Sequence, residues 1–182
     1  MRSSPDSDSS ILTEHIRDVP DFPKPGIVFK DISPLCADPK AFRSFVNSLA
    51  EEYRDLKPDV IVAVDARGFV FGGALAYQLG TGVVMVRKKG KLPGDTLSAE
   101  YELEYGSATL EMHEDALKPG QKVVIVDDLL ATGGTVRATV DLCRRLGAEV
   151  LGCAFLVELG FLNGRAKLSD IPIFAPVQVE GE

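Results

Sequence analysis

Two adjacent aspartates, Asp127 and Asp128, follow an apolar run in the stretch VVIVDDLLATGGT, which covers residues 123–135. Paired carboxylates can accept hydrogen bonds from two vicinal hydroxyl groups, or they can hold Mg²⁺ through water. A single aspartate would be enough to cap a tight turn. That alternative leaves the second aspartate and the following loop unexplained, so we favour a ligand site.

The loop after the carboxylates is suited to binding a phosphate. It consists of Ala131, Thr132, Gly133, Gly134 and Thr135. The loop leads into a predicted helix, whose unpaired amides and dipole favour an anion. The glycines permit positive φ and a close approach of the backbone, and the threonines add hydroxyl donors. The stretch lacks the GKS/T ending of a Walker loop and the GxGxxG pattern. Carboxylates followed by a phosphate cradle describe a receptor for a ribose 5-phosphate.

The elements that position this loop follow an alternating pattern. Buried strands are predicted at 59–64, 82–86 and 122–126, with helices at 68–80 and about 135–146. Such alternation indicates right-handed βαβ units and a mainly parallel sheet flanked by helices. Ligands of these sheets collect beyond the carboxyl ends of the strands, so the loops after the three strands are expected to converge.

The other predicted elements frame this sheet. Residues 1–9 are expected to be disordered because Ser, Asp and Pro bury little apolar area. A period-two pattern from Ala99, with the polar face Glu100, Glu102 and Glu104, predicts a β-ribbon. The remaining expectations are a helix at 11–17, an extended Pro-rich segment at 20–34, a helix that Asp38 caps, and strands at 149–159 and 171–177.

The composition fits one soluble domain. The 182 residues are 45% hydrophobic and 26% charged, with no internal repeat, so we expect a single domain over 1–182. The net charge of −7 disfavours a nucleic-acid surface. No apolar run reaches the roughly 20 residues that span a bilayer. With no secretory signal and three cysteines in no CxxC pair, a cytoplasmic protein is expected.

Several motifs carry a family resemblance. The stretch VVIVDDLLATGGT resembles the phosphoribosyl-pyrophosphate motif of the type I phosphoribosyltransferases. Together with DFPKPGIVFKDISPL, ARGF, RKKGKLPG and LEYG, it looks like the adenine branch of that family. The likeness runs from about Val19 to Val177. It implies the type I phosphoribosyltransferase fold, with a β-ribbon flap and an N-terminal hood. The implied reaction is adenine plus phosphoribosyl pyrophosphate giving AMP and pyrophosphate, in a homodimer.

The resemblance assigns the diphosphate to two basic loops. It places Arg67, with the main chain of Asp65 and Ala66, on the pyrophosphate, and it implies a cis peptide between Asp65 and Ala66. The run RKKGK contributes Lys88, together with Arg87 and Lys91, which the resemblance suggests act across a dimer interface. Planar guanidinium groups suit phosphate oxygens. The alternative for this run is a solvated surface loop.

The remaining roles concern the sugar and its reaction. Asp127 and Asp128 are expected to grip the ribose hydroxyls and to stabilise an oxocarbenium-like state. Mg²⁺ is expected to be held mainly by substrate oxygens, with Asp127 or Asp128 as ligands through water. Glu104 is the candidate general acid/base, and Tyr105 would close the flap against water. The alternative for all three ribbon glutamates is a solvated face.

The base pocket is assigned to the motif GIVFK. Phe29 would stack on adenine with Leu159 opposite, while the main chain of Val28 reads the ring edge; the alternative for Phe29 is an ordinary core residue. Lys30 stands where related enzymes usually carry arginine, whose contacts lysine does not reproduce. Two other functions stay open. One is transfer to hypoxanthine, xanthine or guanine, and the other is a regulator that binds phosphoribosyl pyrophosphate without turnover.

Overall fold

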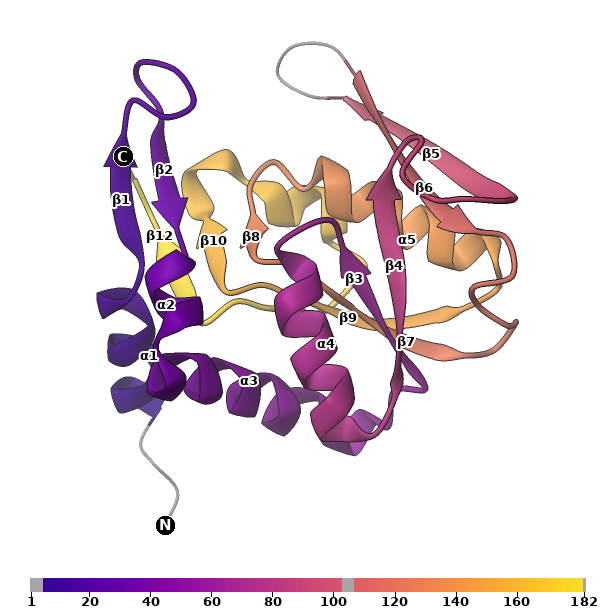
Figure 1. Cartoon of the computed structure of the whole chain (residues 1–182), viewed down its shortest axis with the longest axis horizontal. Helices are drawn as coiled ribbons and strands as arrows, with labels where there is room; N and C mark the ends of the chain where they lie inside the picture. Colours follow the sequence, from indigo (N-terminus) through magenta and orange to yellow (C-terminus); the bar gives the residue numbers. More distant parts are fainter. Residues whose placement is uncertain (1–4, 103–106, 182) are drawn as a thin grey trace.

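A mixed sheet forms the centre of the computed structural model, which describes residues 5–102 and 107–181, with side chains from residue 10 onward (Figure 1). In this described part its strand order is β11-β9-β7-β3-β4-β6-β5. The strands from β11 to β4 are parallel, and β6 and β5 join antiparallel. Their bounds are β3 Val60–Val64, β4 Gly82–Lys88, β5 Thr96–Glu102, β6 Ser107–His113, β7 Lys122–Val126, β9 Glu149–Ala154 and β11 Ile173–Phe174.

Two smaller sheets lie beside this one. Strands β1 (Arg17–Pro20) and β2 (Val28–Asp31) pair antiparallel and make the N-terminal hood. Strands β8 (Leu129–Leu130), β10 (Val157–Leu159) and β12 (Val177–Val179) pair parallel. The expected fold class, a mainly parallel sheet flanked by helices with a ribbon and a hood, is therefore confirmed.

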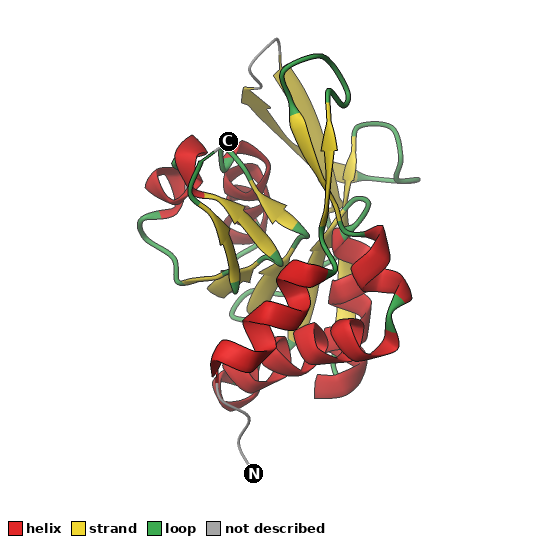
Figure 2. Ribbon diagram, turned by 90° about the vertical axis from the view of Figure 1, so that its left-hand side faces the viewer, coloured by secondary structure: helices red, strands yellow, loops and turns green. Residues whose placement is uncertain are grey.

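Helices cover both faces of the central sheet. The strands are buried on both sides, so alternate residues pack in opposite directions. Ile61 and Val124 pack with α3 (Pro39–Tyr53) and α4 (Gly68–Leu79), whereas Val62 and Val123 pack with α5 (Gly134–Arg145). The helices are α1 Pro5–Glu14, α2 Ser33–Ala37, α3 Pro39–Tyr53, α4 Gly68–Leu79 and α5 Gly134–Arg145, with 3₁₀ turns at Arg54–Leu56, Gly160–Leu162 and Gly164–Leu168. Figure 2 shows most helices gathered at one end and the ribbon strands at the other.

The helix boundaries follow local signals where the sequence carries them. The side chain of Asp38 accepts hydrogen bonds from the amides of Lys40 and Ala41, so the predicted cap of α3 is confirmed. Helix α4 ends at Gly80, whose φ of 72° suits glycine. None of the helices in the described residues has the length and apolar character to cross a membrane.

The N-terminal expectations need correction. The first helix covers Pro5–Glu14 rather than 11–17, so residues 5–9 are helical and not disordered. Two interactions explain the shift. Leu12 is buried against the core that includes α3, and Arg17 belongs to β1, where it pairs with Asp31 of β2. The Pro-rich segment is not the single extended run that was predicted: residues 21–27 turn back between β1 and β2, and α2 begins at Ser33 with Pro34 in its first turn.

The C-terminal expectations also need correction. The strand expected at 149–159 is two strands in different sheets, β9 and β10, because the chain switches sheets at Phe155 and Leu156. There the amide of Phe155 bonds to Phe174, and the amide of Leu156 bonds to Asp128. The strand expected at 171–177 divides likewise into β11 and β12. Both predicted runs are mostly apolar and show no change of period, so the sequence pattern carries no sign of the switch.

Candidate active site

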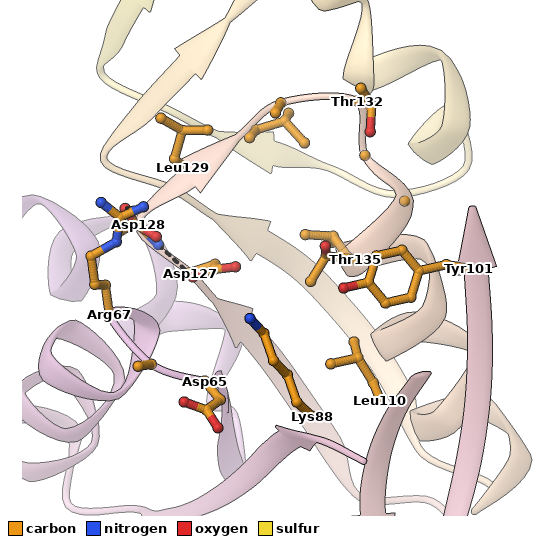
Figure 3. Close-up of a pocket in the computed structure, with 16 residues that line it drawn as sticks. Asp65, Arg67, Lys88, Tyr101, Leu110, Asp127, Asp128, Leu129, Thr132 and Thr135 are labelled. Atoms are coloured by element: carbon orange, nitrogen blue, oxygen red, sulfur yellow. Dashed lines mark hydrogen bonds and ion pairs between the residues drawn. The ribbon is translucent and has the colours of Figure 1, made fainter. Parts of the chain in front are cut away.

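The loops after β3, β4 and β7 converge on one pocket of about 390 Å³ (Figure 3). This confirms the predicted convergence at the carboxyl ends of the parallel strands. The pocket is lined by predicted and unpredicted residues. The predicted ones are Asp65, Ala66, Arg67, Lys88, Asp127, Asp128, Ala131, Thr132, Gly133, Gly134 and Thr135. The others are Tyr101, Leu110, Leu129, Leu130 and Val136.

The loop 131–135 presents an uncapped helix N-terminus to the pocket. Gly133 is the N-cap of α5, with φ of 79°, and no side chain caps the helix. The first turn carries no acidic residue, so its amides face the pocket without a competing anion. Gly133 therefore has the predicted positive φ. The second glycine serves another purpose: a Cβ on Gly134 would lie 3.2 Å from Cδ2 of Tyr101, so the missing side chain makes room for the ribbon.

The two aspartates lie at the floor of the pocket. Two backbone amides, of Leu156 and Val157, donate to the carbonyl of Asp128 at 3.0 Å and hold the turn in place. The amide of Asp128 donates to Oδ1 of Asp127 at 2.9 Å. Oδ2 of Asp128 lies 2.9 Å from Nη2 of Arg67 as an ion pair, yet it accepts no hydrogen bond from the described residues. The side chain of Arg67 covers this buried oxygen, so a hydroxyl group of a ligand can reach it once Arg67 moves away.

Burial perturbs both carboxyl groups. Asp127 reaches the pocket surface but is enclosed on its other sides, and this desolvation raises its pKa well above the usual range. The adjacent charge of Asp128 raises the pKa of Asp127 further. The pKa of Asp128 is also raised by burial, against the opposing effect of Arg67. A pair of this kind favours a ligand that brings hydrogen-bond donors or a positive charge.

The loop after β3 carries the cis peptide expected between Asp65 and Ala66. The Arg67 side chain extends from it toward Asp128, as Figure 3 shows. Its Cζ atom also lies 5.0 Å from the ring centroid of Phe29, in a cation–π contact. Arg67 therefore stands between the pocket and the hood.

The basic run RKKGK, residues 87–91, begins within the last residues of β4, and its cations have different partners. Lys88 lines the pocket, but Arg87 and Lys91 are not among the lining residues. Nε of Arg87 donates to Oδ2 of Asp65 at 3.0 Å, and Nη1 donates to the carbonyl of Lys91 at 3.2 Å. Arg87 thus fixes the cis-peptide loop of its own chain.

The predicted base-pocket residues lie outside the described pocket. Val28, Phe29 and Lys30 belong to β2 and Leu159 ends β10. The ring of Phe29 meets that of Phe22 edge to face at 5.1 Å. Nζ of Lys30 lies 2.7 Å from Oδ1 of its cross-strand neighbour Asp18, so its charge is already paired within the hood.

Sequence reasoning missed Tyr101, which projects from β5 into the pocket (Figure 3). The alternating pattern places Tyr101 on the face opposite the glutamates, and that apolar face was the available signal. Glu104 and Tyr105 lie outside the described residues. Glu100 and Glu102 are exposed, as expected for a solvated ribbon face.

Comparison with known proteins places this site in a family. The model of the phosphoribosyl transferase domain matches residues 38–172. The adenine phosphoribosyltransferase of Carboxydothermus hydrogenoformans is 56% identical over 92% of this chain and 98% of its own length. The crystal structure of the Rhodothermus marinus adenine phosphoribosyltransferase superposes with a TM-score of 0.92 at 47% identity, covering 96% of this chain and 99% of that one.

A third comparison involves bound ligands. The adenine phosphoribosyltransferase of Saccharomyces cerevisiae, complexed with D-2,5-dideoxy-2,5-imino-altritol 1,6-bisphosphate and adenine, superposes with a TM-score of 0.89 at 41% identity, covering 94% of this chain and 99% of that one. Sequence, fold and the convergent loops agree. This chain belongs to the phosphoribosyltransferase family, within its adenine phosphoribosyltransferase branch.

Proposed function

We propose that this protein is a purine-salvage enzyme that transfers the 5-phosphoribosyl group from phosphoribosyl pyrophosphate to adenine, giving AMP and pyrophosphate. One observation carries the proposal: among the described residues, a helix N-terminus that no side chain caps lies next to a buried carboxylate pair, one oxygen of which accepts no hydrogen bond. A sugar that bears a phosphate at one end and vicinal hydroxyls on its ring supplies both kinds of partner. The names of the relatives and the ligands of the yeast enzyme support the same substrate.

The 5-phosphate is assigned to the loop 131–135. The amides at the start of α5 donate to its oxygens, and the hydroxyls of Thr132 and Thr135 add two more donors. The ribose hydroxyls then lie over Asp127 and Asp128, where Oδ2 of Asp128 accepts one of them once Arg67 has moved away. This arrangement fixes the sugar at both ends and exposes its reacting carbon toward Arg67 and Lys88.

The diphosphate is assigned to the cations beyond that carbon. Arg67 and Lys88 both line the pocket, and the main chain of Asp65 and Ala66 lies beside them. Arg67 must leave Phe29 and Asp128 to reach the diphosphate, whose charge makes it the stronger partner for a guanidinium group. As the bond to the leaving group breaks, these cations stabilise the charge that accumulates on it.

Mg²⁺ fits this site as an ion that substrate oxygens hold. Within residues 5–102 and 107–181, no three His, Cys, Asp or Glu side chains gather in a metal-binding cluster. Asp127 or Asp128 would hold Mg²⁺ through water, together with phosphate oxygens of the substrate. When bound, the ion neutralises charge on the diphosphate.

The reaction requires that the sugar cation be stabilised and that a proton be removed from the base. Asp127 and Asp128 lie under the ribose, where negative charge stabilises an oxocarbenium-like carbon. A nitrogen of adenine attacks this carbon from the hood side. Glu104 takes the proton that the base must lose, and Tyr105 helps to close the flap, because water is a rival nucleophile.

The base is assigned to the hood. Adenine stacks on Phe29 once Arg67 withdraws, with Leu159 opposite and the main chain of Val28 at the ring edge. Lys30 keeps its ion pair with Asp18 and contributes to the base indirectly, by holding β2 against β1.

Homodimer formation is supported by one apolar surface. Val70 and Tyr77 of α4 and Val83 and Met85 of β4 are between 41% and 91% exposed, and the two elements pack side by side. Exposed apolar groups on adjacent elements are typical of subunit interfaces. Such a dimer would bring the basic loop, with Arg87 and Lys91, near the partner.

The proposal includes a cytoplasmic location, which the state of the thiols supports. Cys36, Cys143 and Cys153 are free, and the last two are buried in one core. Unpaired buried thiols suit a reducing compartment such as the cytoplasm. Residues 1–182 are proposed to act as one domain.

A panel of bases tests the function. The protein is mixed with phosphoribosyl pyrophosphate, Mg²⁺ and either adenine, hypoxanthine, xanthine or guanine, and pyrophosphate release is followed. We expect release with adenine. Pyrophosphate release with another purine but not with adenine would show that the enzyme is specific for that other base. Tight binding of phosphoribosyl pyrophosphate with no release for any base would favour the regulator.

A further inference from the structure

A second segment of the chain touches the phosphate loop from outside the pocket. It is the turn 163–165, which follows β10 and opens the 3₁₀ turn Gly164–Leu168. Gly164 is buried, and a Cβ on it would collide with the carbonyl oxygen of Ala131. A Cβ on Gly133 would lie 2.6 Å from the carbonyl oxygen of Gly164. The two backbones therefore fit against each other with no room for a side chain on either.

Because the two backbones are in such close contact, the position of the loop 131–135 depends on the position of the turn 163–165. The backbone amides that are assigned to the 5-phosphate belong to residues directly beside Gly133. A shift of Gly164 by a few tenths of an ångström must therefore move these amides. A phosphate site is sensitive to such shifts because hydrogen bonds weaken steeply as their angles worsen. Whatever holds Gly164 in place also positions the cradle.

An ion pair holds the turn. Nε and Nη2 of Arg165 donate to both carboxylate oxygens of Glu158, with distances of 2.7, 2.9 and 2.7 Å. Glu158 lies on β10 with only 6% of its surface exposed, and its cross-strand neighbour is Leu130 of β8. β8 leads directly into the phosphate loop. The pair therefore ties the turn to the same small sheet from which the loop emerges.

Stability alone is a poor reason for this pair. A buried carboxylate loses its hydration, and apolar residues of similar volume often stabilise a fold equally well or better. A bidentate guanidinium–carboxylate pair has another property, since it fixes the orientation of the two side chains as well as the distance between them. A fixed orientation is what is needed to hold the adjacent backbone of Gly164 in one position.

We propose that Arg165 and Glu158 are positioning residues for phosphoribosyl transfer, because their ion pair holds the Gly164 backbone against Ala131 and Gly133 and so sets the loop that binds the 5-phosphate. The inference rests on the proposed function. Neither side chain lines the pocket, so the pair acts through the backbone of Gly164.

Two probes separate this role from general stability. Ribose 5-phosphate reports on the cradle, and pyrophosphate with Mg²⁺ reports on the cations Arg67 and Lys88. Both affinities are measured by calorimetry on the full-length chain. For Arg165→Ala we expect the Kd of ribose 5-phosphate to rise at least tenfold, with the Kd of pyrophosphate within about twofold of wild type. In turnover, KM for phosphoribosyl pyrophosphate should rise far more than kcat falls.

Further variants test the geometry of the pair. Arg165→Lys keeps the charge but cannot bridge both carboxylate oxygens, so it should recover only part of the lost affinity. Glu158→Gln should match Arg165→Ala, and the double variant should lose little more than either single one. Arg144→Ala is the matched control. The Arg144 side chain also makes a 2.7 Å ion pair and is 42% exposed, against 43% for the Arg165 side chain. Arg144 lies in the last turn of α5, at the end of the helix away from the loop.

Three results would overturn the inference. One is a ribose 5-phosphate Kd within twofold of wild type in both Arg165 variants. Another is an equal loss for both probes, with a lowered melting temperature, which would make the pair purely structural. The third is a wild-type protein that binds neither probe, which would refute the proposed function and this inference with it. Unchanged affinities in Arg144→Ala support the inference.

Discussion

Replacement of Gly133 by alanine is the sharpest single perturbation of the phosphate loop. The residue has φ of 79°, where a side chain is strained, and its Cβ would lie 2.6 Å from the Gly164 carbonyl oxygen. Ordinary contacts begin near 3.4 Å, and the obstacle is backbone rather than a flexible side chain. One of the two loops must therefore move.

The magnitude follows from two contributions. Left-handed backbone costs an alanine about 1–2 kcal/mol. Forcing an extra carbon into close packing costs about 1–3 kcal/mol. Since about 1 kcal/mol shifts the melting temperature of a chain this long by roughly 2–4 °C, a loss of about 4–20 °C is expected. Displaced amides should also raise the Kd of phosphoribosyl pyrophosphate at least tenfold, about 1.4 kcal/mol.

The assay compares Gly133→Ala with Gly120→Ala. Gly120 has φ of 81° but nothing within 4 Å of its Cβ position, and it precedes β7 at the end opposite the site. Gly120→Ala therefore introduces the backbone strain alone, whereas Gly133→Ala introduces both the strain and the collision with Gly164. Calorimetric titration with phosphoribosyl pyrophosphate and thermal melts are run on both. If Gly133→Ala melts no lower than Gly120→Ala and binds as wild type does, the reasoning about this loop is wrong.

Further predictions concern the carboxylates, the flap, the hood and the dimer face. Asp127→Asn should abolish most turnover yet raise the melting temperature of the ligand-free protein. The raised pKa of Asp127 means that the folded state keeps a proton that the unfolded chain releases, so stability falls as pH rises above the usual carboxyl range, and the gain from asparagine should grow with pH in thermal melts. Glu104→Ala should lower kcat by about 10²–10⁴ with unchanged affinity for phosphoribosyl pyrophosphate, as single-turnover and binding assays would measure. Lys30→Arg should change KM for adenine by less than about threefold, because Asp18, its partner, is largely exposed. Tyr77→Glu should yield monomers in sedimentation experiments, since Tyr77 is 91% exposed on the proposed dimer face.

The site residues that were predicted from sequence are mostly close together in the chain. Asp127 and Gly133 belong to one strand–loop–helix unit, whose parts are encoded by an apolar run, two acids and two glycines. The cap of α3 is equally local, because Asp38 meets amides only two and three residues away. Interactions of this range depend on backbone geometry that short motifs specify.

The errors arose where a distant segment decides the outcome. The chain leaves one sheet for another at Phe155 because Phe174 and Asp128 offer partners there, and an apolar run reads the same in either sheet. Tyr101 was missed because its role depends on how the ribbon packs against α5, not on its own neighbours.

The sequence by itself determined the chemistry available to this protein: a glycine-rich loop suited to a phosphate, a pair of acids, and cations after successive strands. Only the tertiary structure decided how these parts meet, with Arg67 between Asp128 and Phe29, and Gly164 pressed against Gly133. The physical reason is the sequence separation of the interacting residues. Local motifs specify dihedral angles and hydrogen bonds within a few residues, whereas contacts across 30 or more residues depend on the packing of the whole sheet.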